Sequence, residues 1–514
     1  MILAALTFTA CGDFLEPDSE SEFVPEDAVS LNELLLGEAY QRNDMEGFNI
    51  FLGLLDDDVE AAPYQVPNEG FDGNLYLASF AWQPDMFKMM EEAGAGHINM
   101  YERYYEVILG ANAVLDYIPE VKDTEENINK VKAQAYALRG FYYLNLVNIF
   151  GQPYNHNPEA PGVPLKLNSG IEESNDYLKR KTVAEVYEQI LSDLHTAEET
   201  YLALPKSEQW SDNFRTSLPM VQLTLSRTYL YMENWEMAAH YAKLVMDNTN
   251  FSLEDLNNVP LNGKNDAGET VRTYMVYPTY SSSETIWPYG NVTDMFEWTY
   301  DGANSTSTNS NTGNKMHAYF QASEELLGTF VDYDLRLNRY IVKAPAGNSG
   351  ELMPMAFGKV NVGTTYYLPQ HATGIFGRCL RLSEAYLNYA EAMAMTGTAG
   401  MDEATAALNE LRAKRFDPED YEEESFDTPE ELVQFIRDER RRELCFEGHR
   451  WFDLRRWGMP SFTHKWHDNA ESTSTFRLEE NDLLYTLPLP DEALQMNTSL
   501  EQNELPGKRM PIVE

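Results

Sequence analysis

Helical periodicity runs through most of this chain, and it is the feature that most limits what the chain can fold into. The segment 103–151 repeats small or apolar residues at helical spacing, at Ala133, Ala137, Gly140 and Leu144. Small residues on one helix face let a second helix approach closely. The segment 182–204 begins with Thr182 and has Glu185 three positions later, which is a capping-box pattern at a helix start. The sequence therefore predicts a mainly α fold.

The predicted helices come in pairs. The pair within 220–247 follows the spacing of a tetratricopeptide repeat at Leu225, Ser226, Tyr229, Ala238, Ala242 and Val245. Asn234 and Trp235 mark its turn, and Gln222 stands where the repeat usually has Trp. Further helices are expected at 381–395, 403–414 and 429–446. Because each pair cannot bury its apolar face alone, the pairs are expected to stack into a tetratricopeptide-like scaffold with long irregular loops and a few short strands.

A segment of different composition, 251–374, lies between the helical blocks. It is rich in Asn, Ser, Thr, Gly, Tyr and Trp, it has no sustained period, and it includes the polar tract 304–314. We expect loops and short strands here. Irregular segments held on a rigid scaffold are frequent sites of ligand recognition.

The charge of the chain limits its partners. Lys and Arg total 38 and Asp and Glu total 83, so the formal net charge is −45. Such a field repels phosphate backbones and anionic membrane surfaces, so nucleic acid is not expected as a partner.

Seven arginines nevertheless lie in the short stretch 437–457, among bulky apolar residues. On a helix, the three acids Glu439, Glu443 and Glu447 recur every four positions. Arg440, Arg442 and Arg450 lie where they can pair with carboxylates. We interpret the stretch as a partly buried ion-pair network that fixes packing geometry, rather than as a nucleic-acid site.

The first eleven residues are uncharged and mostly apolar, and they are too short to span a bilayer. They end in Phe8-Thr9-Ala10-Cys11, which resembles a bacterial lipobox with Phe where Leu is usual. In a lipobox the cysteine is acylated and becomes the mature N-terminus. Residues 1–10 are thus predicted to be a removed signal peptide, and residues 11–30 an acidic tether after Cys11. The alternative is an unprocessed hydrophobic N-terminus.

The remaining cysteines and histidines offer no recognisable metal site. Cys379 and Cys445 lie in helix-like patterns without CxxC spacing, so core thiols are expected. His464 and His467 form the close histidine pair, but no third ligand stands at a recognisable spacing. We therefore expect no metal and no cofactor.

Several dispersed motifs, taken in order, resemble the SusD/RagB family of helical nutrient-binding lipoproteins. The motifs are AYALRGFYYLNLVNIFG, GVPLKL, KTVAEVYEQILSDL, LRLSEAYLNYAEAMAMTG, ALNELRAKR, IRDERRRELCFEGHRWFDLRRWG and LPLPDEALQMNTSLEQN. The resemblance covers nearly the whole mature chain. It implies an N-terminal helical region over 31–250, a loop-rich ligand-binding region over 251–374 and a C-terminal helical region over 375–514.

The resemblance also implies a function. Such a protein would be anchored at the cell surface in the outer membrane through Cys11, capture oligosaccharides and deliver them to a TonB-dependent transporter. One alternative keeps the scaffold and changes the ligand to peptide, as some RagB-like members suggest. A third class, a glycosidase with paired carboxylates, is disfavoured because no recognisable catalytic motif is present.

Sugar rings pack their C–H faces on Trp and Tyr, and their hydroxyls need Asn, Asp, Gln or Arg partners. Two aromatic and amide-rich segments, 71–87 and 274–304, combine these features. The candidate ligand-binding residues are Asp72, Asn74, Trp82, Tyr280, Trp287, Tyr289, Asn291, Trp298 and Tyr300. For each aromatic residue, a core position is the competing interpretation.

Overall fold

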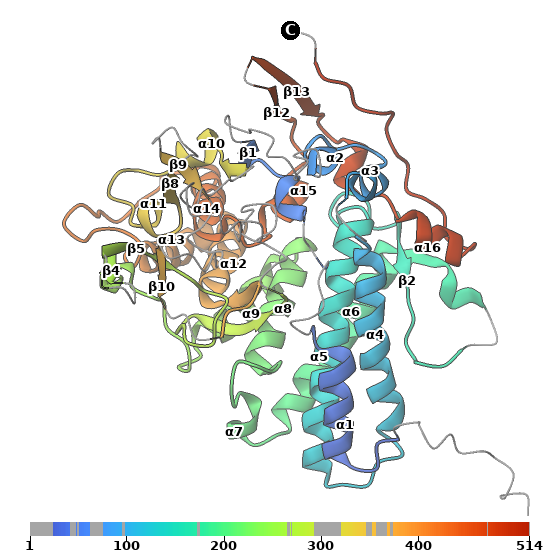
Figure 1. Ribbon diagram of the computed structural model, residues 1–514. Coiled ribbons are helices and arrows are strands. Elements are labelled where there is room, and N and C mark those ends of the chain that lie inside the picture. The colour runs from blue at the N-terminus through green and yellow to red at the C-terminus, as the bar shows by residue number, and fades with distance from the viewer. Residues whose placement is uncertain are drawn as a thin grey trace, which may run out of the picture.

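Figure 1 shows the computed structural model of the chain. The structure describes residues 24–41, 48, 51–61, 76–94, 98–171, 175–264, 268, 270–291, 320–345, 352–355, 367–370, 374–469 and 471–512.

Long helices packed against their neighbours form the scaffold, which confirms the predicted mainly α, tetratricopeptide-like fold (Figure 1). The longer helices are α4 (Met100–Tyr117), α5 (Glu125–Phe150), α6 (Val183–Leu202), α8 (Leu218–Tyr231), α9 (Trp235–Met246), α12 (Leu382–Ala394), α13 (Met401–Arg412) and α14 (Pro429–Leu444). Helix α5 packs against α4 and α6, α8 packs against α9, and α12 packs against α9, α13 and α14. The predicted helix pairs are thus present.

Local sequence signals position these helices. Thr182 and Glu185 form the predicted capping box at the start of α6. Asn234 caps α9 at the predicted turn by accepting a hydrogen bond from the Met237 N–H. Gly140 lies where α5 crosses α6, and a Cβ there would come within 2.9 Å of Leu194 Cγ. The small residues of α5 therefore allow the close helix approach that the sequence predicts.

Shorter helices and single turns complete the helical elements. They are α1 (Ala28–Leu34), η2 (Leu35–Ala39), η3 (Leu52–Leu54), α2 (Leu77–Phe80), α3 (Met86–Glu92), η5 (Asn175–Leu178), α7 (Lys206–Gln209), η6 (Leu256–Asn258), α10 (Glu324–Leu327), α11 (Arg336–Arg339), η8 (Gly397–Gly400), α15 (Arg450–Arg456), η9 (Leu483–Tyr485) and α16 (Asp491–Met496). Within the described residues, no helix has both the length and the apolar composition needed to cross a membrane.

The strands are short and pair in small sheets. They are β1 (Val59–Ala61), β2 (Pro161–Pro164), β3 (Arg180–Thr182), β4 (Asn262–Lys264), β5 (Thr270–Met275), β6 (Thr285–Tyr289), β7 (Phe320–Ala322), β8 (Val342–Pro345), β9 (Leu352–Met355), β10 (Tyr367–Gln370), β11 (Arg378–Arg381), β12 (Phe462–Asn469) and β13 (Ser472–Leu478). Antiparallel pairs are β1–β7, β2–β3, β4–β5, β6–β11, β8–β9 and β12–β13, and β5–β10 is parallel.

The segment between α9 and α12 is an insertion in the helical scaffold. Helices α9 and α12 pack directly on each other although more than a hundred residues separate them in sequence. In Figure 1 the strands of this segment lie beside α12, α13 and α14. One continuous hydrophobic core joins the helices to β6, β7 and β11. The scaffold therefore holds the ends of the irregular segments in place.

Candidate functional site

The arginine-rich stretch 437–457 forms a buried ion-pair network with Glu443 of α14 at its centre. The Glu443 carboxylate is fully buried and lies 2.8 Å from Arg381, 3.0 Å from Arg336 and 3.0 Å from Arg415. These arginines belong to three separate segments, so one carboxylate ties α14 to α11, to β11 and to the end of α13. Burial alone would raise the pKa of Glu443, but the three guanidinium groups hold it well below its usual range.

Glu439, one helical turn earlier, repeats this arrangement. Its carboxylate lies 2.7 Å from Arg336, 2.7 Å from Arg412 and 2.8 Å from Arg442. Burial opposes ionisation here too, and the same guanidinium groups lower the pKa of Glu439. Buried and paired charge in this stretch was the prediction from sequence, and it is confirmed.

Some of the other arginines pair within the stretch 437–457, and others pair with residues far away in the sequence. Arg440 donates to Asp453 at 2.8 Å, within the same stretch. Arg450 instead binds Asp57 with two parallel hydrogen bonds of 2.6 and 2.8 Å, and Arg441 donates to Asp58 at 2.8 Å. The acidic run that precedes β1 thus receives arginines from both α14 and α15, and the network is structural.

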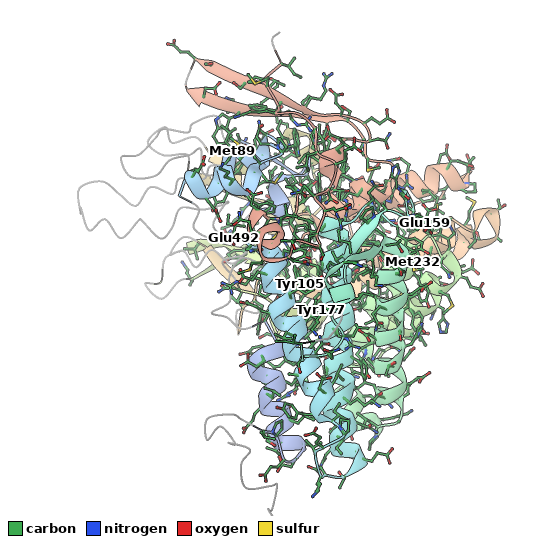
Figure 2. The ribbon with its side chains drawn as sticks, turned by 90° about the vertical axis from the view of Figure 1, so that its right-hand side faces the viewer. Met89, Tyr105, Glu159, Tyr177, Met232 and Glu492 are labelled. Carbon is green, nitrogen blue, oxygen red and sulfur yellow. The ribbon has the colours of Figure 1, made fainter. Side chains whose placement is uncertain are left out.

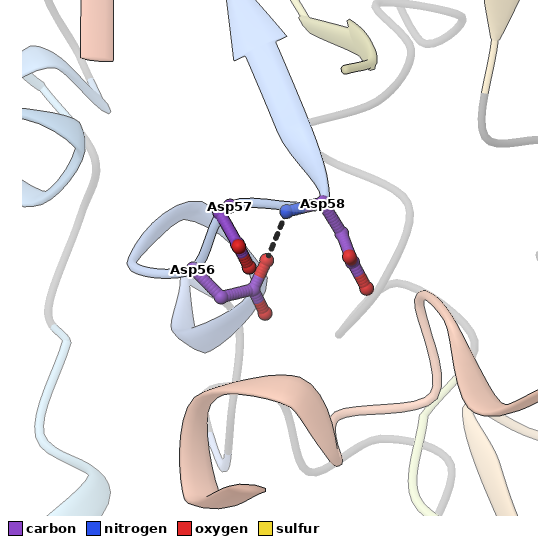
Figure 3. Close-up of side chains that lie close together, drawn as sticks. All are labelled: Asp56, Asp57 and Asp58. Carbon is purple, nitrogen blue, oxygen red and sulfur yellow. Dashed lines mark hydrogen bonds between the residues drawn. The ribbon is translucent and has the colours of Figure 1, made fainter. Parts of the chain in front are cut away.

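That acidic run also gathers three carboxylates that could approach a metal ion. Figure 3 shows Asp56, Asp57 and Asp58, with the Asp58 N–H donating to Asp56 Oδ1 at 3.0 Å. Asp57 and Asp58 are already balanced by arginines. Burial, and then the neighbouring charges of Asp58 and Asp57, raise the pKa of Asp56 well above its usual value. Because Asp57 pairs with Arg450 and Asp58 with Arg441, the cluster is an anchor between β1 and α14–α15.

Trp82, a candidate sugar-binding residue, is fully buried. Its ring stacks on His464 with centroids 4.2 Å apart, and its Nε1 donates to the Leu55 carbonyl at 2.9 Å. Phe80 covers the other side of His464 at 4.1 Å. Trp82 has no exposed ring face in this structure, so its ligand-binding role stays a prediction that its burial does not favour.

Trp287 and Tyr289 of β6 also lie in the core. Their rings stack at 4.8 Å, and Phe141 of α5 packs edge-on against both. Trp287 is 1% exposed and Tyr289 is 8% exposed. Asn291, which follows β6, is buried as well. The β6 residues therefore attach the inserted segment to the scaffold, and a role in binding for them likewise stays a prediction.

Among the candidate aromatic residues that the structure describes, Tyr280 is the one that reaches the surface. It is half-buried, and its ring lies 4.3 Å from that of Phe214, which is 50% exposed. Gly374, with a φ of +62°, lies against the Tyr280 ring, where a side chain would collide. Sequence reasoning missed Phe214, because a lone Phe before α8 carries no periodic or compositional signal.

The first of the two segments predicted to bind ligand, 71–87, contacts the β1–β7 ribbon through Tyr76. Ala61, which ends β1, pairs with Phe320, which begins β7. The Tyr76 ring, at the start of α2, packs edge-on against Phe320 with centroids 6.5 Å apart. Ala61 and Tyr76, the described residues on either side of 62–75, therefore both lie beside Phe320. Asp72, Asn74, Trp298, Tyr300 and Cys11 lie outside the described residues.

Sequence reasoning also missed two surface cavities. One has a volume of about 550 Å³ and is lined by amide and charged side chains, among them Gln152, Glu159 and Asn503. The other, of about 380 Å³, has Tyr105 and Tyr177 in its wall. Figure 2 shows both regions, with Glu159 labelled for the first and Tyr105 and Tyr177 labelled close together for the second. These residues come from segments distant in sequence, so no local pattern indicates them.

Comparison with known proteins places the chain in a family. A model of the SusD family matches residues 370–507, and a model described as "Starch-binding associating with outer membrane" matches residues 49–230. Two curated relatives from Formosa agariphila, SusD-like protein P2 and SusD-like protein P38, are each 25% identical to this chain. The P2 match spans 437 residues, 78% of this chain and 79% of the relative, and the P38 match spans 428 residues, 75% and 78%.

Solved structures share the fold. A SusD superfamily protein from Bacteroides thetaiotaomicron matches with a TM-score of 0.68 and 22% identity, covering 93% of this chain and 100% of that one. A SusD-like carbohydrate binding protein from Bacteroides vulgatus matches with a TM-score of 0.66 and 19% identity, covering 93% and 98%. The motifs, both family models, the relatives and the helical scaffold agree, and the chain therefore belongs to the SusD/RagB family.

Proposed function

We propose that this protein is a cell-surface lipoprotein that binds oligosaccharides non-covalently and delivers them to a TonB-dependent outer-membrane transporter. The observation that carries the proposal is the match of residues 49–230 to the family described as "Starch-binding associating with outer membrane", together with the aromatic and amide-rich composition of the two candidate segments. Asp72 and Asn74 of one segment and Trp298 and Tyr300 of the other would supply hydroxyl partners and stacking rings. The family description and the carbohydrate-binding relative support the choice of a glycan.

The scaffold suits a binding role without chemistry. Carboxylates of its interior, such as Glu443 and Asp57, form ion pairs that hold segments together. We propose that the ligand leaves unchanged. Affinity should be modest, because a surface site must release its ligand to the transporter.

Binding is tested with the mature chain by a glycan-array screen that includes peptides, followed by calorimetry on the best ligand. Trp298→Ala should weaken binding about tenfold or more, since a stacked aromatic contributes roughly 1–3 kcal/mol by analogy with ring stacking on bases. Tyr333→Ala is the matched control, because Tyr333 is 42% exposed and lies outside both segments. Unchanged affinity in Trp298→Ala would exclude this ring from the site.

Three outcomes separate the function classes. Glycan binding with no product after prolonged incubation supports the proposal. Peptide binding without glycan binding favours the RagB-like alternative, and cleaved sugar favours a glycosidase. Delivery is tested by affinity purification from outer membranes: we expect a TonB-dependent transporter to co-purify with the tagged lipoprotein, and its absence would contradict that part.

A further inference from the structure

A cavity of about 340 Å³ lies between α1, α5 and the segment that leads into α8. Figure 1 shows α1 and α7 at the end of the molecule opposite β1 and α2, so this cavity is separate from the β1–β7 ribbon. One wall consists of Tyr201, Glu208, Trp210, Ser211, Asp212, Arg215, Thr216 and Ser217. The volume falls in the lower range of small-molecule sites.

Two polar atoms on this wall are buried and have no hydrogen-bond partner among the described residues. They are Trp210 Nε1 and Ser217 Oγ. Ser217 is 3% exposed. Leaving such groups unpaired costs roughly 1–3 kcal/mol each, so native proteins rarely keep them unless something binds there.

Ser217 also stands at the start of α8, where its hydroxyl would normally cap the helix. Here the side chain makes no capping hydrogen bond, and Pro219 occupies the second helical position. The first-turn N–H groups of Leu218 and Met220 have no acceptor within the helix. The N-terminus of α8 carries partial positive charge, which favours an anionic group beside the free hydroxyl.

Arg215 adds a full positive charge to the same wall. Its Nη1 donates to the neutral side-chain oxygen of Asn32 at 2.6 Å. Arg215 is half-buried, and among the described side chains no carboxylate pairs with it, whereas Arg227 and Arg456 each bind a Glu carboxylate with two hydrogen bonds. A guanidinium group with free donors is suited to bind a carboxylate.

The remaining charges of the cavity are accounted for. Lys130 bridges Glu126 at 3.1 Å and Glu208 at 3.0 Å. Asp212 accepts the N–H of Phe214 at 3.0 Å. Oxygens of Asp212 and Glu208 can also accept hydrogen bonds from hydroxyl groups. The cavity therefore combines donors for an oxyanion, acceptors for hydroxyls and the apolar rings of Trp210 and Tyr201.

We propose that this cavity is a second binding site and that it takes an acidic sugar residue, a hexuronic acid. The carboxylate accepts hydrogen bonds from Trp210 Nε1, Ser217 Oγ and Arg215, and the ring packs against Trp210. The same oxyanion chemistry would suit free sulfate, so the test includes both ligands. Binding here is independent of the β1–β7 ribbon and of the function proposed for it.

The test is calorimetry on the full mature chain with glucuronate, galacturonate, neutral glucose and sodium sulfate. We expect a uronate to bind at least about tenfold more tightly than glucose or sulfate. Trp210→Phe and Ser217→Ala should each weaken uronate binding about tenfold or more, because each removes one hydrogen bond to a charged group. Sulfate binding equal to uronate binding, or equal affinity for glucose, would overturn the proposed ligand class.

Ligand-free stability provides a second readout. Each variant removes a buried polar group that has no partner, so the Tm without ligand should hold or rise while the Tm increase caused by uronate is lost. A lower ligand-free Tm in both variants would show that these atoms serve the fold, and would overturn the proposal. Arg103→Gln, at an exposed arginine paired with Glu106, is the charge control and should leave uronate affinity unchanged. Trp298→Ala should also leave it unchanged, which separates this site from the proposed oligosaccharide site.

Discussion

Replacing Glu443 by Gln tests whether the arginine network holds the fold together. The two side chains have nearly the same volume, so the substitution removes one buried negative charge without making a cavity. Arg336, Arg381 and Arg415 then lose a carboxylate at 2.8–3.0 Å. The Gln amide also places N–H donors where these three guanidinium groups need a hydrogen-bond acceptor. Removing one partner of a buried ion pair typically costs about 3–5 kcal/mol.

The structure favours the lower end of that range. Arg336 keeps Asp334 at 2.8 Å, Arg381 keeps Glu447 at 2.8 Å, and Arg415 keeps Glu284 at 2.6 Å, so no guanidinium group is left alone. We therefore expect a loss of about 3 kcal/mol. An unfolding entropy of about 2.1 cal/mol/K per residue over 514 residues gives roughly 1.1 kcal/mol/K, so Tm should fall by about 3 °C if the chain unfolds cooperatively.

The assay is differential scanning calorimetry of Glu443→Gln beside the wild type, with near-UV circular dichroism to check the folded state. Asp438→Asn is the matched control: it makes the same charge change on α14, but its carboxylate receives an exposed hydrogen bond from Gln434. We expect the control to melt with the wild type. If Glu443→Gln melts no lower than Asp438→Asn, the network does not stabilise the fold and our reasoning is refuted.

Three further predictions concern packing, pH and anchoring. Gly110→Ala would place a Cβ 2.1 Å from the Glu38 carbonyl oxygen, where α4 meets η2, and should lower the urea midpoint by the equivalent of about 1–3 kcal/mol; an unchanged midpoint would contradict this close contact. Acid should destabilise the protein in two stages, measured as urea midpoints between pH 7 and pH 3. Burial, and then Arg227 and Arg440, hold the pKa of His449 well below 6.5, so the unfolded chain binds an extra proton and stability falls as pH drops below about 6.5. Burial would raise the pKa of Glu391, but Arg456 lowers it to about 2, so its contribution is complete above about 4.5 and is lost as pH falls toward 2; a flat profile would contradict both assignments. Cys11→Ala should move the protein from the outer-membrane fraction to the soluble fraction, and continued membrane retention would exclude Cys11 as the anchor.

The helical scaffold could be predicted from the sequence because its signals are local. The Thr182–Glu185 capping box, the Asn234 turn and the small residues of α5 each act within a few positions of the chain. Such signals can be recognised without knowing which distant segments each helix packs against. The order of the motifs along the chain indicated the SusD/RagB family, and the family-model comparisons supported it.

The pairing of charges and the exposure of rings depended instead on distant segments. Arg441 and its partner Asp58 are 383 positions apart, and no pattern near either residue indicates the other. Trp82 and Tyr280 are both aromatic residues in loop-like sequence, yet His464 covers one and the other reaches the surface beside Phe214. Burial depends on which remote groups pack against a side chain. The helices therefore follow from local backbone and side-chain preferences, whereas ion pairs, buried rings and cavities exist only once the folded chain has brought these segments together.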